Sequence, residues 1–298
     1  MRRIYFVCLF SVLCCATARG DEPISIWPDL APGETTKLTG EKMPPREGEK
    51  LAITRVVKIT QPTMTVHRAA KPNGAAIVIL PGGGFSKVVP DLEGTEAAEF
   101  FNKHGITAFV LSYRTTDDKQ TPGWIKPRQD AERALSLVRS QAEQYGLKKD
   151  RIGLLAFSAG GQTGARLLSG GEAKTYAPID DVDKVSHRPD FAILVYPWNM
   201  YDAKTDALAE GIAPPKPSSQ YTPPPTFIVH TDDDRSSSLG AVLFYAGLKK
   251  HGVSAELHVY FNGGHGYGLR PVAGSQISTW PAHAAFWLEN KVLAAPAK

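Results

Sequence analysis

Cysteine is nearly absent from the sequence, and the few cysteines are confined to one end. Only three of the 298 residues are cysteine, and Cys8, Cys14 and Cys15 all lie among the first 15 positions. Without this end, the chain has no thiol for a disulfide, a nucleophile or a metal ligand. Disulfide-stapled folds, thiol proteases and cysteine-liganded zinc sites are therefore excluded for the rest of the chain.

The sequence also lacks a hydrophobic run long enough for a transmembrane helix, which needs about 20 apolar residues. The apolar stretch at residues 4–15 is shorter, follows Met1, Arg2 and Arg3, and precedes the small residues Ala-Thr-Ala at 16–18. These features predict a secretory signal peptide at residues 1–18. We expect export to the periplasm or the medium, with no stable membrane insertion after cleavage.

Charge of one sign is not in excess. The chain has 34 Lys and Arg against 30 Asp and Glu, and loss of Arg2 and Arg3 with the leader would lower the net charge of +4 by two. No basic run or RNA-reading motif occurs, so no nucleic-acid partner is expected. No H-E-x-x-H motif, paired Cys/His cluster or calcium loop occurs either, so we expect no metal and no cofactor. Nothing in the sequence specifies an oligomeric state.

The pattern of the remaining chain predicts one catalytic domain at residues 51–298. Residues 19–50 are rich in Pro, Gly, Glu and Lys, which indicates an extended N-terminal segment on the surface. Strand-like runs then occupy residues 52–59, 63–67, 75–80, 107–113, 152–157, 191–196, 226–230 and 255–260. Helical patterns lie near residues 92–104, 131–142, 239–249 and 282–293 and begin again at 159. The Pro-rich, non-periodic residues 199–225 are either a lid or a surface excursion.

Alternating apolar strands and amphipathic helices predict an α/β fold, with a mostly parallel twisted sheet covered by helices on both faces. Such sheets carry their ligands at the carboxyl ends of the strands. Residues with unusual chemistry should therefore be sought there.

A serine stands at the end of one of these strands. The run at residues 152–157 leads directly into Ser158-Ala159-Gly160-Gly161 and a helical pattern, which is typical of a nucleophile elbow. Ala156 occupies the place of the first glycine of G-x-S-x-G. An ordinary serine in a glycine-rich turn is the alternative, and other motifs are needed to decide.

Glycine-rich loops follow two other strands. Gly82, Gly83 and Gly84 come after residues 75–80, where their backbone N–H groups can face a developing oxyanion. We expect the donors to be Gly83 or Gly84 together with Ala159. Residues 263–268 follow the last strand and present His265 between glycines, which favours His265 as the catalytic base. The other histidines lie in strand, helix or ordinary loop patterns.

The acid of a Ser-Asp-His triad should follow residues 226–231, because the chain order in this architecture is nucleophile, acid, histidine. Asp232, Asp233 and Asp234 all stand there. A buried carboxylate is needed to hold the imidazole in the correct tautomer, so one of the three must point inward. Position after a strand does not choose among them.

Together these motifs resemble the alpha/beta hydrolases of the bifunctional acetylxylan/feruloyl esterase-like group, which are related to hormone-sensitive-lipase-like esterases. The resemblance covers roughly residues 50–292 and is carried by residues 80–85, 150–161, 224–230 and 263–270. Counting back from the family's Phe-Tyr-x-Ala-Leu helix, matched here by Phe244-Tyr245-Ala246-Gly247-Leu248, assigns the acid to Asp233, with Asp234 next. Arg235-Ser236-Ser237-Ser238 departs from the family's Val-Pro segment, which weakens that assignment.

The resemblance implies a small-molecule or polysaccharide substrate bearing short acyl esters, acetyl above all, with Phe85, Trp198 and Tyr267 contributing to the pocket. Two other functions remain open. A prolyl-oligopeptidase-like serine peptidase shares the fold and triad order but normally has an N-terminal propeller. A non-catalytic binding protein on this scaffold would be expected to lose Ser158, His265 or the glycine loop.

Overall fold

A computed structural model describes residues 23–49, 51–116 and 122–294. The predicted signal peptide therefore lies outside the described residues. Within these ranges, no helix combines the length and the apolar character needed to cross a membrane.

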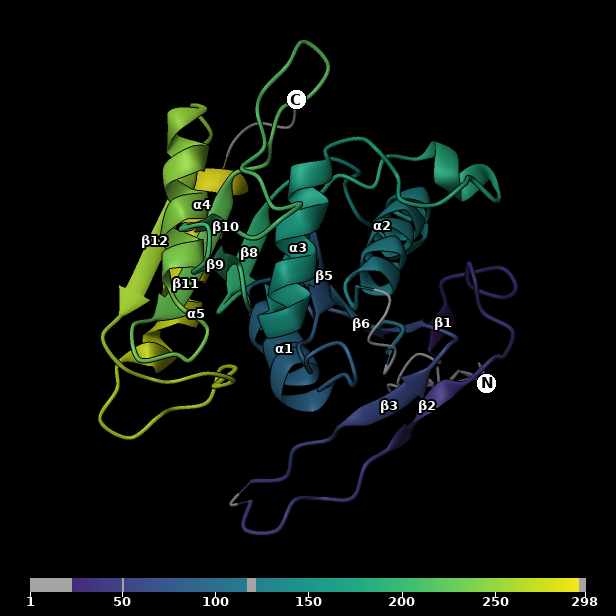
Figure 1. Ribbon diagram of the computed structural model, residues 1–298. Coiled ribbons are helices and arrows are strands. Elements are labelled where there is room, and N and C mark those ends of the chain that lie inside the picture. The colour runs from purple at the N-terminus through teal and green to yellow at the C-terminus, as the bar shows by residue number, and fades with distance from the viewer. Residues whose placement is uncertain (1–22, 50, 117–121, 295–298) are drawn as a thin grey trace, which may run out of the picture.

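The centre of the molecule is an eight-stranded sheet (Figure 1). The order of its strands is β1-β4-β6-β5-β7-β8-β11-β12. From β6 onward every neighbouring pair is parallel, whereas β1 and β4 add an antiparallel edge. The strands are β1 (Ile24–Ser25), β4 (Thr63–His67), β5 (Ala76–Leu80), β6 (Thr107–Ser112), β7 (Ile152–Phe157), β8 (Ala192–Val195), β11 (Thr226–Thr231) and β12 (Ala255–Tyr260). The predicted fold class is confirmed.

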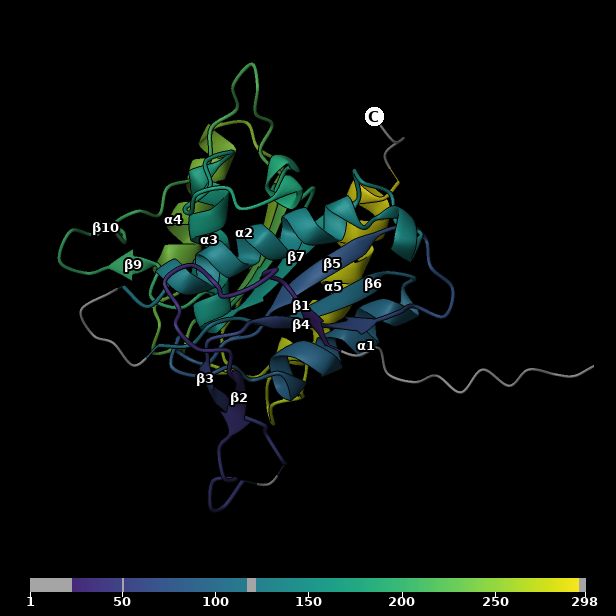
Figure 2. The same cartoon turned by 90° about the vertical axis from the view of Figure 1, so that its right-hand side faces the viewer.

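Helices cover both faces of the sheet (Figures 1 and 2). On one face lie α2 (Ile125–Ser140), α3 (Ser158–Gly170) and α4 (Leu239–Lys250). On the other lie α1 (Glu96–Lys103), preceded by a π-helical turn at Asp91–Thr95, and α5 (Trp280–Trp287). Every residue of β5, β7 and β11 is buried, which explains why these strands read as continuous apolar runs and not as alternating ones.

The N-terminal segment differs from the expected surface excursion. Ile26 and Trp27 are almost fully buried, and β1 extends the sheet by pairing with β4. The Trp27 indole Nε1 donates a 2.9 Å hydrogen bond to Asp130 Oδ1, and Asp130 also pairs with the buried guanidinium of Arg114. Ile26 and Trp27 thus complete the core although they lie in a polar, proline-rich stretch. The average composition of these 32 residues does not indicate their burial.

The second part of this segment forms a separate antiparallel pair, β2 (Thr39–Lys42) with β3 (Val56–Ile59). Figure 1 shows the connection between them projecting away from the sheet. Hydrogen bonds between Val56 and Val88 in both directions, 2.8 and 2.9 Å, fasten β3 to the loop after β5. The projection is therefore tied to the end of the sheet where ligands are expected.

Residues 199–225 lie against the outer side of α3 and α4. They carry the short pair β9 (Tyr201–Asp202) and β10 (Ala207–Leu208), and the Arg166 guanidinium of α3 donates to the Glu210 carbonyl oxygen at 2.7 Å. Gly247 of α4 lies so close to Pro214 that an added Cβ would be 2.2 Å from its ring. Of the two possibilities for this segment, its contacts match the surface excursion.

Replacement of Trp27 by alanine is expected to destabilise the whole domain. The indole packs edge-on against Tyr176 at 4.8 Å between ring centroids, so its removal leaves a cavity and takes one of the two hydrogen-bond donors from Asp130 Oδ1, which keeps Arg114. Losing a buried aromatic side chain costs about 3–5 kcal/mol. Urea denaturation measures this loss; Leu30→Ala, at a side chain that is 40% exposed, is the control and should change stability by no more than about 0.5 kcal/mol. Equal stabilities of the two variants would contradict a core role for the segment.

Candidate active site

Ser158 sits on a strained turn between β7 and α3. Its φ is +52°, a left-handed conformation that non-glycine residues rarely adopt. The next turn of chain has no room for side chains: a Cβ on Gly160 would lie 2.3 Å from the Leu80 carbonyl oxygen, and one on Gly161 would lie 2.8 Å from the Pro197 Cα. Ala156 is fully buried at the end of β7, so the elbow accommodates alanine where the family motif has its first glycine.

A chain of hydrogen bonds joins Ser158, His265 and Asp234. Ser158 Oγ lies 2.7 Å from His265 Nε2, and His265 Nδ1 lies 2.6 Å from Asp234 Oδ2. The Asp234 side chain is buried, and its other oxygen accepts the Ser236 N–H at 2.8 Å. Such an arrangement orients the imidazole so that Nε2 can accept the serine proton.

The expectation that Asp233 contacts His265 is wrong, because the chain turns immediately after β11. The Asp232 N–H continues the parallel ladder to the Tyr260 carbonyl oxygen, and the turn begins at that residue. Side chains alternate between the two faces only while the chain is extended. Because the chain already turns before Asp233, this alternation does not direct the Asp233 side chain toward His265. Ser236, part of the segment that departs from the family pattern, stabilises the acid through its N–H.

Asp233 instead holds the loop that carries His265. Its carboxylate oxygens accept the N–H groups of Gly264 at 2.8 Å and Gly263 at 3.2 Å, and these bonds lower its pKa. Thr231 Oγ1 donates to the Gly264 carbonyl oxygen at 2.7 Å from the other side. Asp233 therefore holds the backbone of the loop that carries His265, and Asp234 orients the imidazole ring of His265.

The glycine loop after β5 lies beside Ser158. A Cβ on Gly82 would lie 2.6 Å from the Ser158 Cβ, and one on Gly83 would lie 2.1 Å from the Lys87 carbonyl oxygen, so neither position tolerates a side chain. Gly83 and Gly84 line one cavity with Ser158 and His265. Among the described residues, the N–H groups of Gly83, Gly84 and Ala159 have no hydrogen-bond acceptor. These donors are free to meet an oxyanion, in the place where the sequence predicts them.

Glu93 is a functional-site residue that sequence reasoning missed. Its buried carboxylate accepts the Gly82 N–H at 2.6 Å and the Tyr196 O–H at 2.8 Å, and burial raises the pKa of Glu93. Tyr196 in turn packs against His265 with the rings tilted by 59° and their centroids 4.9 Å apart. Glu93 thus links the glycine loop to the ring next to the histidine. Because it lies on an ordinary-looking helical start, no sequence motif singled it out.

The cavity above Ser158 has a volume of about 390 Å³. Trp198 lines it, as expected, and the Trp198 N–H donates to the Ser158 carbonyl oxygen at 2.9 Å. Phe85 and Tyr267 do not lie among the described residues that line it: Phe85 packs over Gly123, and Tyr267 is buried against Tyr196. These two pocket expectations are wrong, because both rings turn into the packing beneath the site.

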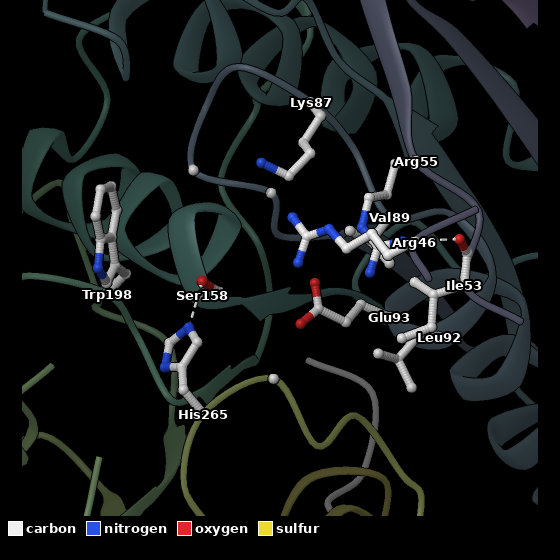
Figure 3. Close-up of a pocket in the computed structure, with 13 residues that line it drawn as sticks. Arg46, Ile53, Arg55, Lys87, Val89, Leu92, Glu93, Ser158, Trp198 and His265 are labelled. Atoms are coloured by element: carbon white, nitrogen blue, oxygen red, sulfur yellow. Dashed lines mark hydrogen bonds between the residues drawn. The ribbon is translucent and has the colours of Figure 1, made fainter. Parts of the chain in front are cut away.

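Figure 3 shows the opposite wall of the cavity, which sequence reasoning also missed. Arg46, Ile53 and Arg55 come from the segment between β2 and β3, and Lys87 comes from the glycine loop. Hydrogen bonds from this segment to Val88 and to Asp91 hold it beside the site. In the part of the chain that the structure describes, no three His, Cys, Asp or Glu side chains are placed to hold a metal ion.

Comparison with known proteins places this geometry in a family. Residues 64–189 match the BD-FAE family model. The chain is 28% identical to the structure of an acetyl ester-xyloside bifunctional hydrolase from Caldicellulosiruptor lactoaceticus, with a TM-score of 0.64 over 90% of this chain and 95% of that one. The chain has the α/β-hydrolase fold and is similar to the BD-FAE family.

Curated relatives of this hydrolase are longer proteins. It is 30% identical over 217 residues to an acetylxylan esterase of Xylanibacter ruminicola, covering 66% of this chain and 42% of the relative. It is 28% identical over 205 residues to endo-1,4-beta-xylanase B of Butyrivibrio fibrisolvens, covering 64% of this chain and 32% of the relative. The chain therefore spans less than half the length of either. Esterase 2 of Thermogutta terrifontis shares the fold, with a TM-score of 0.62 and 21% identity over 87% of this chain and 95% of that one.

Substitution of the two aspartates should separate their roles in this hydrolase. Asp234→Asn is expected to lower the turnover of an ester substrate by up to about 10⁴-fold, the size of the same change in serine proteases, because the amide favours the wrong imidazole tautomer. Asp233→Asn is expected to cost far less, since Asn Oδ1 still accepts one loop N–H. Steady-state kinetics with circular dichroism of both variants measures this. If Asp233→Asn is the more damaging change, the hydrogen-bonded chain described above is not the working one.

The requirement for residues without side chains in the first turn of α3 can be tested by substitution. Gly160→Ala places a methyl group against the backbone of Leu80 and should nearly abolish turnover by displacing Ser158 from the glycine loop. Gly164→Ala is the matched control, because its methyl group would meet only side-chain atoms, the nearest 3.0 Å away. Turnover per folded molecule should separate the two; similar values would show that the close approach is not required.

Proposed function

We propose that this hydrolase is a serine esterase that removes short acyl groups, acetyl above all, from carbohydrate. The observation that carries the proposal is the continuous hydrogen-bonded chain from Asp234 through His265 to Ser158 on a strained elbow, beside a loop with free N–H donors. Neither a structural serine nor a binding pocket requires all of these features together.

In the proposed reaction, His265 Nε2 takes the Ser158 hydroxyl proton while Oγ bonds to the ester carbonyl carbon. The carbonyl oxygen becomes an oxyanion that accepts hydrogen bonds from Ala159 and from Gly83 or Gly84. Collapse breaks the bond to the alcohol oxygen, which receives the proton from His265, and leaves an acyl group on Ser158. Water repeats the sequence, releasing the acid and restoring the serine. Asp234 stabilises the imidazolium in both halves.

The acyl and alcohol parts of the proposed substrate rest on the relatives. The acetylxylan esterase and the acetyl ester-xyloside hydrolase both act, by their names, on acetyl esters or xylosides. Export through a leader at residues 1–18, suggested by its basic start, apolar run and Ala-Thr-Ala end, agrees with a polymer outside the cytoplasm. Mass spectrometry of the exported protein would give a mature N-terminus just after residue 18.

Ser158→Ala is expected to remove nearly all hydrolysis of p-nitrophenyl acetate and of acetylated xylan, because no nucleophile remains to form the acyl-enzyme. A loss of 10³-fold or more is anticipated by analogy with triad removal in serine proteases, of order 10⁶. Ser140→Ala, at an exposed helix end, is the control and should keep full activity. A serine-directed phosphonate should label the wild type only at Ser158.

Measurements on the wild-type protein also test the two alternative functions, a peptidase and a non-catalytic binding protein. Efficient cleavage of a Pro-linked peptide amide with little ester hydrolysis would favour a peptidase. A wild-type protein that binds xylan but releases no acetate and resists the phosphonate would favour a binding protein.

A further inference from the structure

Basic side chains are concentrated on one side of the cavity that contains Ser158. Of the described residues lining it, Arg46, Arg55 and Lys87 are cationic and Glu93 alone is acidic. Figure 3 shows Arg46 and Lys87 directing their charged ends into the cavity, on the side of Ser158 away from Trp198. A cationic wall next to the reacting hydroxyl raises the local concentration of anionic substrates.

The loop that supplies this wall is held in place. Arg55 is buried, forms an ion pair with Glu49, and donates to the Ile53 carbonyl oxygen at 3.2 Å, so its own charge is balanced within the loop. The Thr54 N–H donates to Asp91 Oδ2 at 2.6 Å, which ties the loop to the π-helical turn beside the site. Arg46 therefore belongs to a loop that is held by an internal ion pair and by a hydrogen bond to the turn beside the site.

The Arg46 guanidinium is available for a ligand. It is exposed, and no side-chain hydrogen bond or ion pair with a described residue holds it; its charge acts on Glu49, whose pKa is lowered first by Arg55 and then by Arg46. Glu93, the acidic group in the cavity, already engages Gly82 and Tyr196 with its two oxygens. A planar guanidinium with free N–H groups matches the paired oxygens of a carboxylate or a sulfate.

We propose that Arg46 binds a carboxylate or sulfate on the alcohol part of the ester, so that the substrates are acylated acidic carbohydrates. This inference rests on the proposed function: an acetyl group has no charge, and the alcohol part is then the place for an anion. Arg46 lines the same cavity as Ser158, in which the sugar bonded to a reacting acetate would lie.

Three substrates that differ only in one substituent test the inference. These are mono-O-acetylated methyl glucuronoside, the corresponding methyl glucoside, and its 6-sulfate. The value of kcat/KM should be about tenfold higher for a charged sugar than for the neutral one, the gain expected of one charge-assisted hydrogen bond. The preference should shrink as salt is added, since Arg46 is exposed. The uronate and sulfate arms distinguish the two anions.

Arg46→Gln should reduce the ratio of charged to neutral kcat/KM to near one, mainly through KM, and Arg46→Lys should restore part of it. Lys42→Gln, which removes one charge from β2 outside the cavity, is the matched control and should keep the wild-type ratio. If Arg46 served only to offset the charge of Glu93, Arg46→Gln would lower both substrates equally and leave the ratio unchanged, which overturns the inference.

Failure of the inference and failure of the proposed function give different results. Hydrolysis of p-nitrophenyl acetate with equal rates on charged and neutral sugars overturns the anion site and keeps the esterase. If no ester is hydrolysed, binding of methyl glucuronoside and methyl glucoside, followed by NMR titration of the wild type and Arg46→Gln, decides the matter. Tighter binding of the uronoside that depends on Arg46 supports the site, and equal binding refutes it.

Discussion

The close approach of α3 to the ends of β5 and β8 is the constraint on which the site depends. With no side chain at Gly160 or Gly161, the first turn of the helix rests against the Leu80 carbonyl oxygen and Pro197. This contact forces Ser158 into its left-handed conformation and sets it against Gly82. Because the strands are parallel, their carboxyl ends deliver the serine, the glycine loop, the aspartates and the histidine to one edge.

Two buried carboxylates then organise this edge. Asp234 directs the His265 ring, and Glu93 holds the glycine loop through the Gly82 N–H while receiving the Tyr196 hydroxyl. His230 Nδ1 lies 3.9 Å from Asp234 Oδ2, but burial lowers the pKa of His230, which disfavours a second imidazolium beside the aspartate. In both Asp234 and Glu93, each carboxylate oxygen has a protein hydrogen-bond partner and is shielded from solvent. Such hydrogen bonds offset the cost of burying a polar group in a core.

The N-terminal segment joins the stability of the domain to the shape of its cavity. Its first part buries Trp27 beside Asp130, and its second part places Arg46 and Arg55 opposite Trp198. This second part lies outside residues 64–189, the region that matches the family model. The cavity therefore joins the serine and the glycine loop, which lie inside that region, to a wall built from the N-terminal chain outside it.

The sequence by itself determined the α/β fold, the position of every strand of the central sheet except β1, and the placement of Ser158, His265 and the glycine loop at one edge. Local signals sufficed, because apolar periodicity and glycine spacing act over a few residues. The tertiary structure alone decided between Asp233 and Asp234. The reason is that the conformation of the turn after β11 depends on its contacts with the loop that carries His265. It also decided the contacts of Trp27 and Glu93 and the place of Arg46 in the cavity wall, because the residues that surround them are distant along the chain.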